Sequence, residues 1–369
     1  MNRKSFLTLV GATALLMSTA APLFAMDPHG EAPAERAAGS VYTMTNAPTG
    51  NEVVIFDRDG KGRLTLAGTV ATGGIGSGGG LDQLASQGSL VLTHNKDWLL
   101  AVNAGSNEIS VFRATKNGLE LVDKIASGGV FPTSLAVFRD LVYVLNAGGT
   151  PNITGFTLNH KGHLKPIASS TRALPGLLHS QVGFDPSGEM LLVTDRTNNN
   201  LLAYPLGEDD TPAAPVVSPS HGAGPFSFVF STRGRLLVAE VGSNAVSSYH
   251  IQDDGALKLL TPSVANGQSA TCWIVNVEGG YAFTANPGAH SLSSYRQPRR
   301  GELVLVAGAA GAGTNPIDLA ATENGRFLYA LDPGFGGIDA FQIGAAGSLT
   351  NLGPVATGLP LFAQGIAIR

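Results

Sequence analysis

Acidic and amide side chains recur along this chain at the ends of short apolar segments. Two such segments are residues 142–146 and 328–332. Carboxylates can exchange protons. Carboxylate and amide oxygens can hold a hard cation such as Ca²⁺. The N–H groups of a side-chain amide can donate hydrogen bonds to a carbonyl. We call the seven residues at these positions the polar ladder: Asn46, Asn103, Asn146, Asp195, Glu240, Asn286 and Asp332.

Glu240 and His179 are the ladder-region residues best suited to catalysis. Asn and Asp at strand ends commonly bond a nearby backbone amide, so most of the ladder could serve turns alone. The longer Glu240 side chain suits a turn poorly and could reach a substrate as a general base. His179 opens segment 179–188, and an imidazole near a carboxylate could exchange protons. The alternative is a histidine that only ends a strand.

A second series shows which elements position the ladder. An aromatic residue follows each ladder residue after nine or ten positions, and both series repeat about every 43 to 57 residues. A period in the forties indicates a repeat array or propeller. Asn117-Gly118 and Asp254-Gly255 are hairpin turn signals within the repeats. Four strands per repeat and seven repeats predict an all-β, seven-bladed β-propeller over residues 40–369. The aromatic residues are Phe56, Phe112, Phe156, Tyr204, Tyr249, Tyr295 and Phe341.

The first repeat lacks its first strand, and residues 364–369 have the pattern of that missing strand. We therefore expect the C-terminal segment to pair with residues 41–46 and close the ring. Because the first and second strands of a blade are antiparallel, the ladder and the starts of the first strands should gather at one mouth of the ring. The predicted ligand-binding residues there are Asn103, Asn146, Asp195, Arg196, Asn286, Asp332, Gln87 and Gln364.

The first repeat also carries extra residues at positions 73–87, which are rich in glycine. No Lys-Ser/Thr pair follows, so a phosphate loop is not indicated. We expect a flexible surface loop that overhangs the ring. The single cysteine, Cys272, excludes an internal disulfide, and no adjacent base is evident to activate it. We expect it to be buried packing.

The N-terminal segment and the amino-acid composition limit the classes of protein to which this chain can belong. Charged residues make up 14% of the chain and the net charge is −4, with no basic stripe for nucleic acid. Residues 1–25 read as a signal peptide cleaved after Ala25, and residues 26–39 as a flexible leader. The mature protein is predicted to be periplasmic or secreted and monomeric. No second apolar stretch is long enough to span a membrane.

The repeats resemble those of the lactonase-type seven-bladed propellers, which include propeller forms of 6-phosphogluconolactonase and carboxymuconate-lactonizing enzyme. Residues 179–195 resemble the family's His-x-x-x-Phe-Asp-Pro-x-Gly…Asp segment. Residues 222–240 resemble its Gly-Pro-Arg-His…Gly…Asn-Glu segment. The resemblance implies that His179 and Glu240 occupy active-site positions. It fails at the Arg-His pair, where this chain has Phe226-Ser227, and Arg196 could supply the missing positive charge.

Two functions follow from these residues. The first is a lactone hydrolase, in which Glu240 activates water, His179 orients or protonates, and ladder amides hold the ring carbonyl. The second is a non-catalytic propeller that binds a small ligand, a cell-envelope component or a partner protein. The spacing of His, Asp and Glu matches no recurring metal motif, and no metal or cofactor is predicted.

Overall fold

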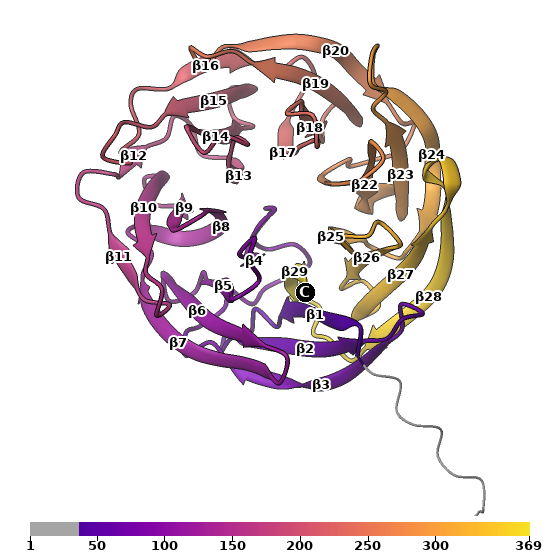
Figure 1. Ribbon diagram of the computed structural model, residues 1–369, viewed down its shortest axis with the longest axis horizontal. Coiled ribbons are helices and arrows are strands. Elements are labelled where there is room, and N and C mark those ends of the chain that lie inside the picture. The colour runs from indigo at the N-terminus through magenta and orange to yellow at the C-terminus, as the bar shows by residue number, and fades with distance from the viewer. Residues whose placement is uncertain (1–36) are drawn as a thin grey trace, which may run out of the picture. The chain divides into compact units, whose positions relative to one another are not determined.

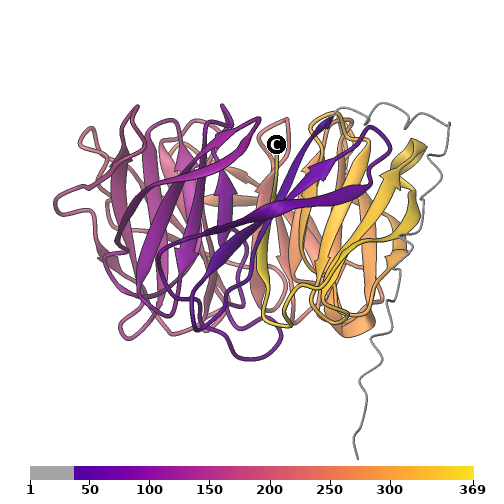
Figure 2. The same ribbon diagram turned by 90° about the horizontal axis from the view of Figure 1, so that it is seen from below.

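The computed structural model describes residues 37–369, which form a ring of seven β-sheets (Figure 1). Within each blade the strands follow one another in antiparallel order from the central axis to the rim, and they run between the two faces of the ring (Figure 2). This confirms the predicted seven-bladed propeller. The predicted signal peptide and residues 26–36 of the predicted leader lie outside the described residues.

The strands of the seven blades have the following bounds. Blade 1 contains β29 (Gln364–Ile368), β1 (Gly39–Met44), β2 (Glu52–Arg58) and β3 (Leu64–Ala71); blade 2, β4 (Leu90–Leu92), β5 (Trp98–Asn103), β6 (Glu108–Thr115) and β7 (Gly118–Ala126). Blade 3 contains β8 (Val130–Phe138), β9 (Leu141–Gly148), β10 (Asn152–Leu158) and β11 (Leu164–Pro166), with β12 (Arg172–Ala173) also paired to β10. Blade 4 contains β13 (His179–Phe184), β14 (Met190–Asp195), β15 (Asn200–Pro205) and β16 (Val216–Pro219); blade 5, β17 (Pro225–Phe230), β18 (Leu236–Glu240), β19 (Ala245–Ile251) and β20 (Leu257–Ala265). Blade 6 contains β21 (Trp273–Val277), β22 (Tyr281–Asn286), β23 (Ser291–Arg296) and β24 (Val304–Ala312); blade 7, β25 (Ile317–Ala321), β26 (Phe327–Asp332), β27 (Gly337–Ile343) and β28 (Leu349–Thr357). Two short 3₁₀ helices, η1 (Pro287–Ala289) and η2 (Ala345–Gly347), lie in connections of blades 6 and 7.

The ring closes as the repeat pattern predicts. Strand β29 pairs antiparallel with β1, with Val41 opposite Ile368 and Met44 opposite Gln364. Beyond the strand end, Ser40 and Arg369 exchange two backbone hydrogen bonds, of 3.2 and 2.8 Å. Both ends of the described chain therefore belong to one sheet, and blade 1 has a complete set of four strands.

The aromatic series builds the core between the blades. Each of the seven residues lies on the third strand of its blade and is buried. Burial of such a side chain contributes about 1.5–3 kcal/mol to the stability of the fold. The regular recurrence of these aromatic residues along the chain therefore reflects packing. The ladder face is the face where the second strand of each blade ends, and the turn face is the opposite one, which carries the turns between first and second strands.

The extra residues of the first repeat cross the ladder face toward the axis. In Figure 1 the chain that leads into β4 extends toward the centre of the ring. Leu84, Ser86 and Ser89 are buried. The expectation of a flexible surface loop is wrong for residues 82–89, because this segment is hydrogen-bonded to three blades. We call it the axial segment.

Candidate functional site

The polar ladder acts mainly as a set of clasps. All seven side chains are buried. Five of them, Asn103, Asn146, Glu240, Asn286 and Asp332, bond to the connection by which the chain enters their own blade. For example, the Asp332 carboxylate accepts bonds from the backbone N–H groups of Thr314 and Asn315, at 2.6 and 2.9 Å. The repeat of these residues is thus explained by a need that every blade shares.

Glu240 is held by hydrogen bonds to one of its two carboxylate oxygens. It is 0% exposed, and its Oε1 accepts bonds from the Gly222 N–H at 2.9 Å and the Ser247 hydroxyl at 2.6 Å. Its Oε2 is buried without a hydrogen-bond partner among the described residues. A Cβ on Gly222 would lie 1.9 Å from that oxygen, so the backbone of Gly222 covers the carboxylate. The catalytic role of Glu240 stays a prediction.

His179 and Asp195 face each other across β13 and β14, as the antiparallel pairing predicts. The Nε2–H of His179 donates to the Pro175 carbonyl at 2.9 Å, which leaves Nδ1 as the unprotonated nitrogen. Burial lowers the pKa of His179, although the Asp195 carboxylate acts in the opposite sense. The imidazole is therefore neutral at pH 7. Asp195 itself accepts bonds from Asn198, at 3.1 Å from the backbone and 2.8 Å from the side chain.

Arg196 lies against the residue that departs from the family motif. Its guanidinium carbon is 5.1 Å from the centroid of the Phe226 ring, and Phe226 in turn contacts Trp273 edge to face at 5.0 Å. The Arg196 Nε is buried and has no hydrogen-bond partner among the described residues. Phe226 stands where the family resemblance implies arginine. The positive charge of Arg196, from blade 4, lies beside that position.

Two carboxyl groups of this region were missed by the sequence analysis: Asp82, which interacts electrostatically with Arg196, and Asp318, which interacts with Asp82. Asp318 lies at the start of β25 and is 6% exposed, and Asp82 begins the axial segment. Burial raises the pKa of Asp318 to about 7, although the Leu319 and Ile366 N–H groups stabilise its ionised form. Burial also raises the pKa of Asp82, to about 8, with Arg196 opposing this and Asp318 adding to it. A detectable signal existed for Asp318, since a carboxylate interrupts the apolar segment 317–320.

Cys272 belongs to the same cluster but is not a nucleophile. It is buried, as predicted, and burial together with nearby Asp82 raises the pKa of its thiol. The protonated thiol is unreactive at neutral pH. We call Asp82, Arg196, Asp318 and the adjoining Phe226 and Cys272 the axial cluster.

The axial segment ties this cluster to the ring. The Trp273 indole N–H donates to the Ser86 carbonyl at 2.9 Å, and the Ile274 N–H donates to the Gln87 side-chain oxygen at 3.0 Å. The Gln87 N–H donates to the Ser180 carbonyl at 3.0 Å. The Ser86 hydroxyl donates to the Thr133 carbonyl at 2.7 Å. Blades 3, 4 and 6 are thus joined through one segment across the axis.

The structure brings only part of the predicted site together. His179, Asp195 and Arg196 lie on consecutive strand ends of blade 4, and Gln87 lies in the axial segment. Gln364 is buried in β29, with its Nε2 lacking a partner among residues 37–369. The amides of Asn103, Asn146 and Asn286 and the carboxylate of Asp332 stay in their own clasps.

A hollow of the ring lies on the turn face, where no site was predicted. It has a volume of about 870 Å³ and is lined by turns of five blades, with His94, Phe184, Phe230 and Glu278 among its residues. Within residues 37–369 no group of three or more His, Cys, Asp or Glu side chains is arranged to hold a metal ion. The same residues include no helix long and apolar enough to cross a membrane.

Known proteins place this arrangement in a family. The family described as "Lactonase, 7-bladed beta-propeller" matches residues 41–177 and 177–275. No match is found among curated proteins.

Similar solved structures include a putative 6-phosphogluconolactonase from Bacteroides fragilis, with 18% identity and a TM-score of 0.72 over 91% of this chain and 100% of that one. The Pseudomonas aeruginosa periplasmic gluconolactonase has 16% identity and a TM-score of 0.69 over 89% of this chain and 100% of that one. A protein from Lactobacillus plantarum has 18% identity and a TM-score of 0.74 over 90% and 99%. At these identities the likeness concerns the fold, and the family match adds the assignment: the chain belongs to the seven-bladed β-propeller lactonase family.

Proposed function

We propose that this protein is an exported lactone hydrolase whose reaction takes place at the axial cluster. The observation that carries the proposal is the Arg196 guanidinium over Phe226, beside the position where the family motif has arginine. Its buried, unpartnered Nε is a hydrogen-bond donor available to a substrate oxygen. The guanidinium interacts with Asp82, which in turn interacts with Asp318, and a cation together with two carboxyl groups of raised pKa is a suitable set for ester hydrolysis.

The chemistry assigns one task to each group. Arg196 donates to the lactone carbonyl and stabilises the negative charge that develops on its oxygen. Asp318, with a pKa of about 7, takes a proton from the attacking water and returns it to the ring oxygen as the acyl C–O bond breaks. The product is a hydroxy acid, which releases its carboxyl proton to water and leaves its carboxylate beside Arg196. Asp82 interacts electrostatically with both Arg196 and Asp318 and so influences the charge of each.

Access to the cluster requires the axial segment to shift. Phe226, Cys272 and Asp318 are almost completely buried, and Ala85 of the segment packs against the hydrophobic cluster that contains Phe226 and Cys272. Glycine residues precede the segment, and Gly78 and Gly79 have φ of +56° and +89°, which glycine adopts readily. A hinge there, with the hydrogen bonds of Ser86 and Gln87 broken, would let residues 83–87 move away from the cluster while Asp82 and β4 stay in place.

The substrate is proposed to be a small sugar-type lactone without a phosphate group. One similar structure is named a periplasmic gluconolactonase and another a putative 6-phosphogluconolactonase. The predicted signal peptide favours export, where phosphorylated sugars are uncommon substrates. The protein is proposed to act as a monomer on this small molecule.

The test is proton release, followed by pH-stat, from a panel of neutral and anionic lactones. Wild type is compared with Asp318→Asn and Glu240→Gln, after subtraction of spontaneous hydrolysis. Turnover that disappears in Asp318→Asn and persists in Glu240→Gln supports the assignment of the base. Turnover that disappears only in Glu240→Gln returns the base to Glu240, as the family resemblance implies.

The alternative is a non-catalytic propeller that binds a small ligand, a cell-envelope component or a partner protein. It is favoured by the use of Glu240 and the ladder amides in internal clasps and by the covered axial cluster. Absence of turnover on every lactone, combined with a ligand-dependent rise in melting temperature, would support this alternative.

A further inference from the structure

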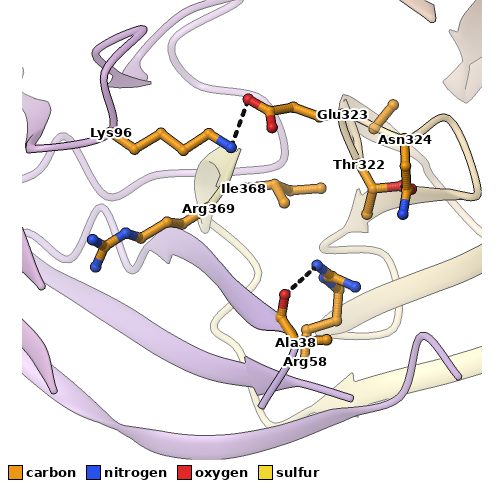
Figure 3. A pocket seen from close by; sticks show the side chains of 9 residues that line it. Ala38, Arg58, Lys96, Thr322, Glu323, Asn324, Ile368 and Arg369 are labelled. Atoms are coloured by element: carbon orange, nitrogen blue, oxygen red, sulfur yellow. Dashed lines mark hydrogen bonds and ion pairs between the residues drawn. The ribbon is translucent and has the colours of Figure 1, made fainter. Parts of the chain in front are cut away.

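A charged cavity lies on the turn face at the seam of the ring, away from the axial cluster. It has a volume of about 250 Å³ and lies between the end of blade 1 and turns of blades 2 and 7 (Figure 3). Arg58, Arg369 and Lys96 line it together with one acidic residue, Glu323. We propose that this cavity binds a small oxyanion, a carboxylate or a phosphate group, with Arg58 as its main anchor.

Arg58 has a buried charge that no acidic side chain of the described residues pairs with. It ends β2, is 8% exposed, and donates one hydrogen bond, of 2.9 Å, to the neutral Ala38 carbonyl. Its Nε has no partner, and no acidic side chain of residues 37–369 forms an ion pair with it. A guanidinium removed from water in this way is costly unless an anion accompanies it.

The other charged side chains of the cavity do not neutralise Arg58. Lys96 and Glu323 form an ion pair at 2.5 Å that links the turns of blades 2 and 7 across the end of blade 1. Figure 3 shows this pair on one side of the cavity and Arg58 on the other. Arg369 follows β29, and its Nη1 is buried without a partner among the described residues. Neither the Arg58 nor the Arg369 guanidinium thus forms an ion pair with an acidic side chain of residues 37–369.

Size and chemistry define the ligand. Guanidinium presents parallel N–H groups that match two oxygens of a carboxylate or a phosphate. The cavity is smaller than the roughly 300–1,000 Å³ typical of sites for drug-sized molecules, so a small anion fits better than a large one. Thr322 and Asn324 add neutral polar groups to the wall.

Binding there should stabilise the closure of the ring. Arg58 belongs to β2, while Arg369 follows β29, so an anion between them links the two ends of the propeller. An anion that binds only the folded chain raises its melting temperature in proportion to the logarithm of its concentration. This inference is independent of lactone turnover.

The experiment measures melting temperature and calorimetric binding for the purified chain in sodium phosphate, sodium acetate and sodium chloride at matched ionic strength and pH. We expect phosphate, acetate or both to stabilise beyond chloride, and the two arms distinguish which oxyanion the site prefers. Arg58→Gln should weaken binding by about ten- to a hundredfold, the value of hydrogen bonds to a charged group. Arg113→Gln is the matched control, because its guanidinium stacks on Trp98 in blade 2 and does not line the cavity.

Equal stabilisation by all three salts would overturn the proposal, as would equal binding by wild type and Arg58→Gln. If Arg58→Gln does not fold, Arg369→Gln and Arg58→Lys replace it. Unchanged anion affinity in both of these folded variants would also contradict the site.

Discussion

The guanidinium of Arg196 lies 5.1 Å from the centroid of the Phe226 ring, so a residue of blade 4 covers the residue of blade 5 that stands where the family resemblance implies arginine. A cation over an aromatic face gains about 0.5–2 kcal/mol, depending on how far it is removed from water. Phe226 is itself fixed by Trp273, whose indole holds the axial segment. The positive charge, the aromatic support and the covering segment are therefore one connected structure.

The pH dependence of turnover should follow Asp318. A general base acts in its ionised form, and burial raises the pKa of this carboxyl to about 7. We expect kcat/KM to rise with pH and to level off above about pH 7. Initial rates from pH 5 to 9, corrected for spontaneous lactone hydrolysis, measure this. A profile that is flat from pH 5 upward would contradict Asp318 as the base.

Stability should change with pH in the opposite direction. Because Asp318 has a higher pKa in the folded state than its ordinary value near 3.8, the folded protein binds a proton more tightly than the unfolded chain. Its destabilising effect is fully present above about pH 7 and is relieved as the pH falls toward 4. Asp82 acts in the same sense from about pH 8. Chemical denaturation at pH 5.5 and 8.5 should show greater stability at pH 5.5, and Asp318→Asn should reduce the difference.

Removal of the Glu240 clasp should destabilise the fold. Glu240→Ala leaves the Gly222 N–H and the Ser247 hydroxyl without their buried acceptor and creates a cavity. We expect a loss of about 2–4 kcal/mol in the free energy of unfolding. Asp253→Ala, in an exposed turn, is the control and should change little. Unchanged stability of Glu240→Ala together with lost turnover would show that the carboxylate serves catalysis.

Deletion of residues 363–369 should destabilise the whole ring. The deletion removes β29, exposes the inner edge of β1 and leaves blade 1 with three strands. We expect loss of cooperative unfolding or a marked drop in the yield of folded protein, measured by calorimetry and circular dichroism. A truncated chain that unfolds cooperatively at the same temperature would contradict the role of β29 in ring closure.

The fold was predictable because it rests on repetition. The ladder and the aromatic series keep an offset of nine or ten residues through seven copies, and each copy meets the same packing requirement, so the number of blades and the closing strand follow from counting. The same repetition concealed the site. A polar residue that clasps a connection has the same position and type as one that faces a ligand, and only the contacts of Glu240 distinguish the two.

The axial cluster depends on contacts that are distant in sequence. Asp82, Arg196 and Asp318 come from three repeats and share no spacing, and the axial segment looks like a surplus of glycine in the sequence. Its bonds to Trp273 and Ile274 join residues 187 positions apart, which no local pattern reveals. Only Arg196 was identified beforehand, through the departure at Phe226.

Arg196 provides the most direct test of the account. Lactone turnover of Arg196→Gln should be compared with wild type and with Arg139→Gln, whose guanidinium also lies 5.1 Å from a phenylalanine centroid but on the turn face. Loss of the oxyanion donor predicts a fall of about 10²–10³ in kcat for Arg196→Gln and no change for Arg139→Gln. Equal turnover in all three folded proteins would contradict catalysis at the axial cluster.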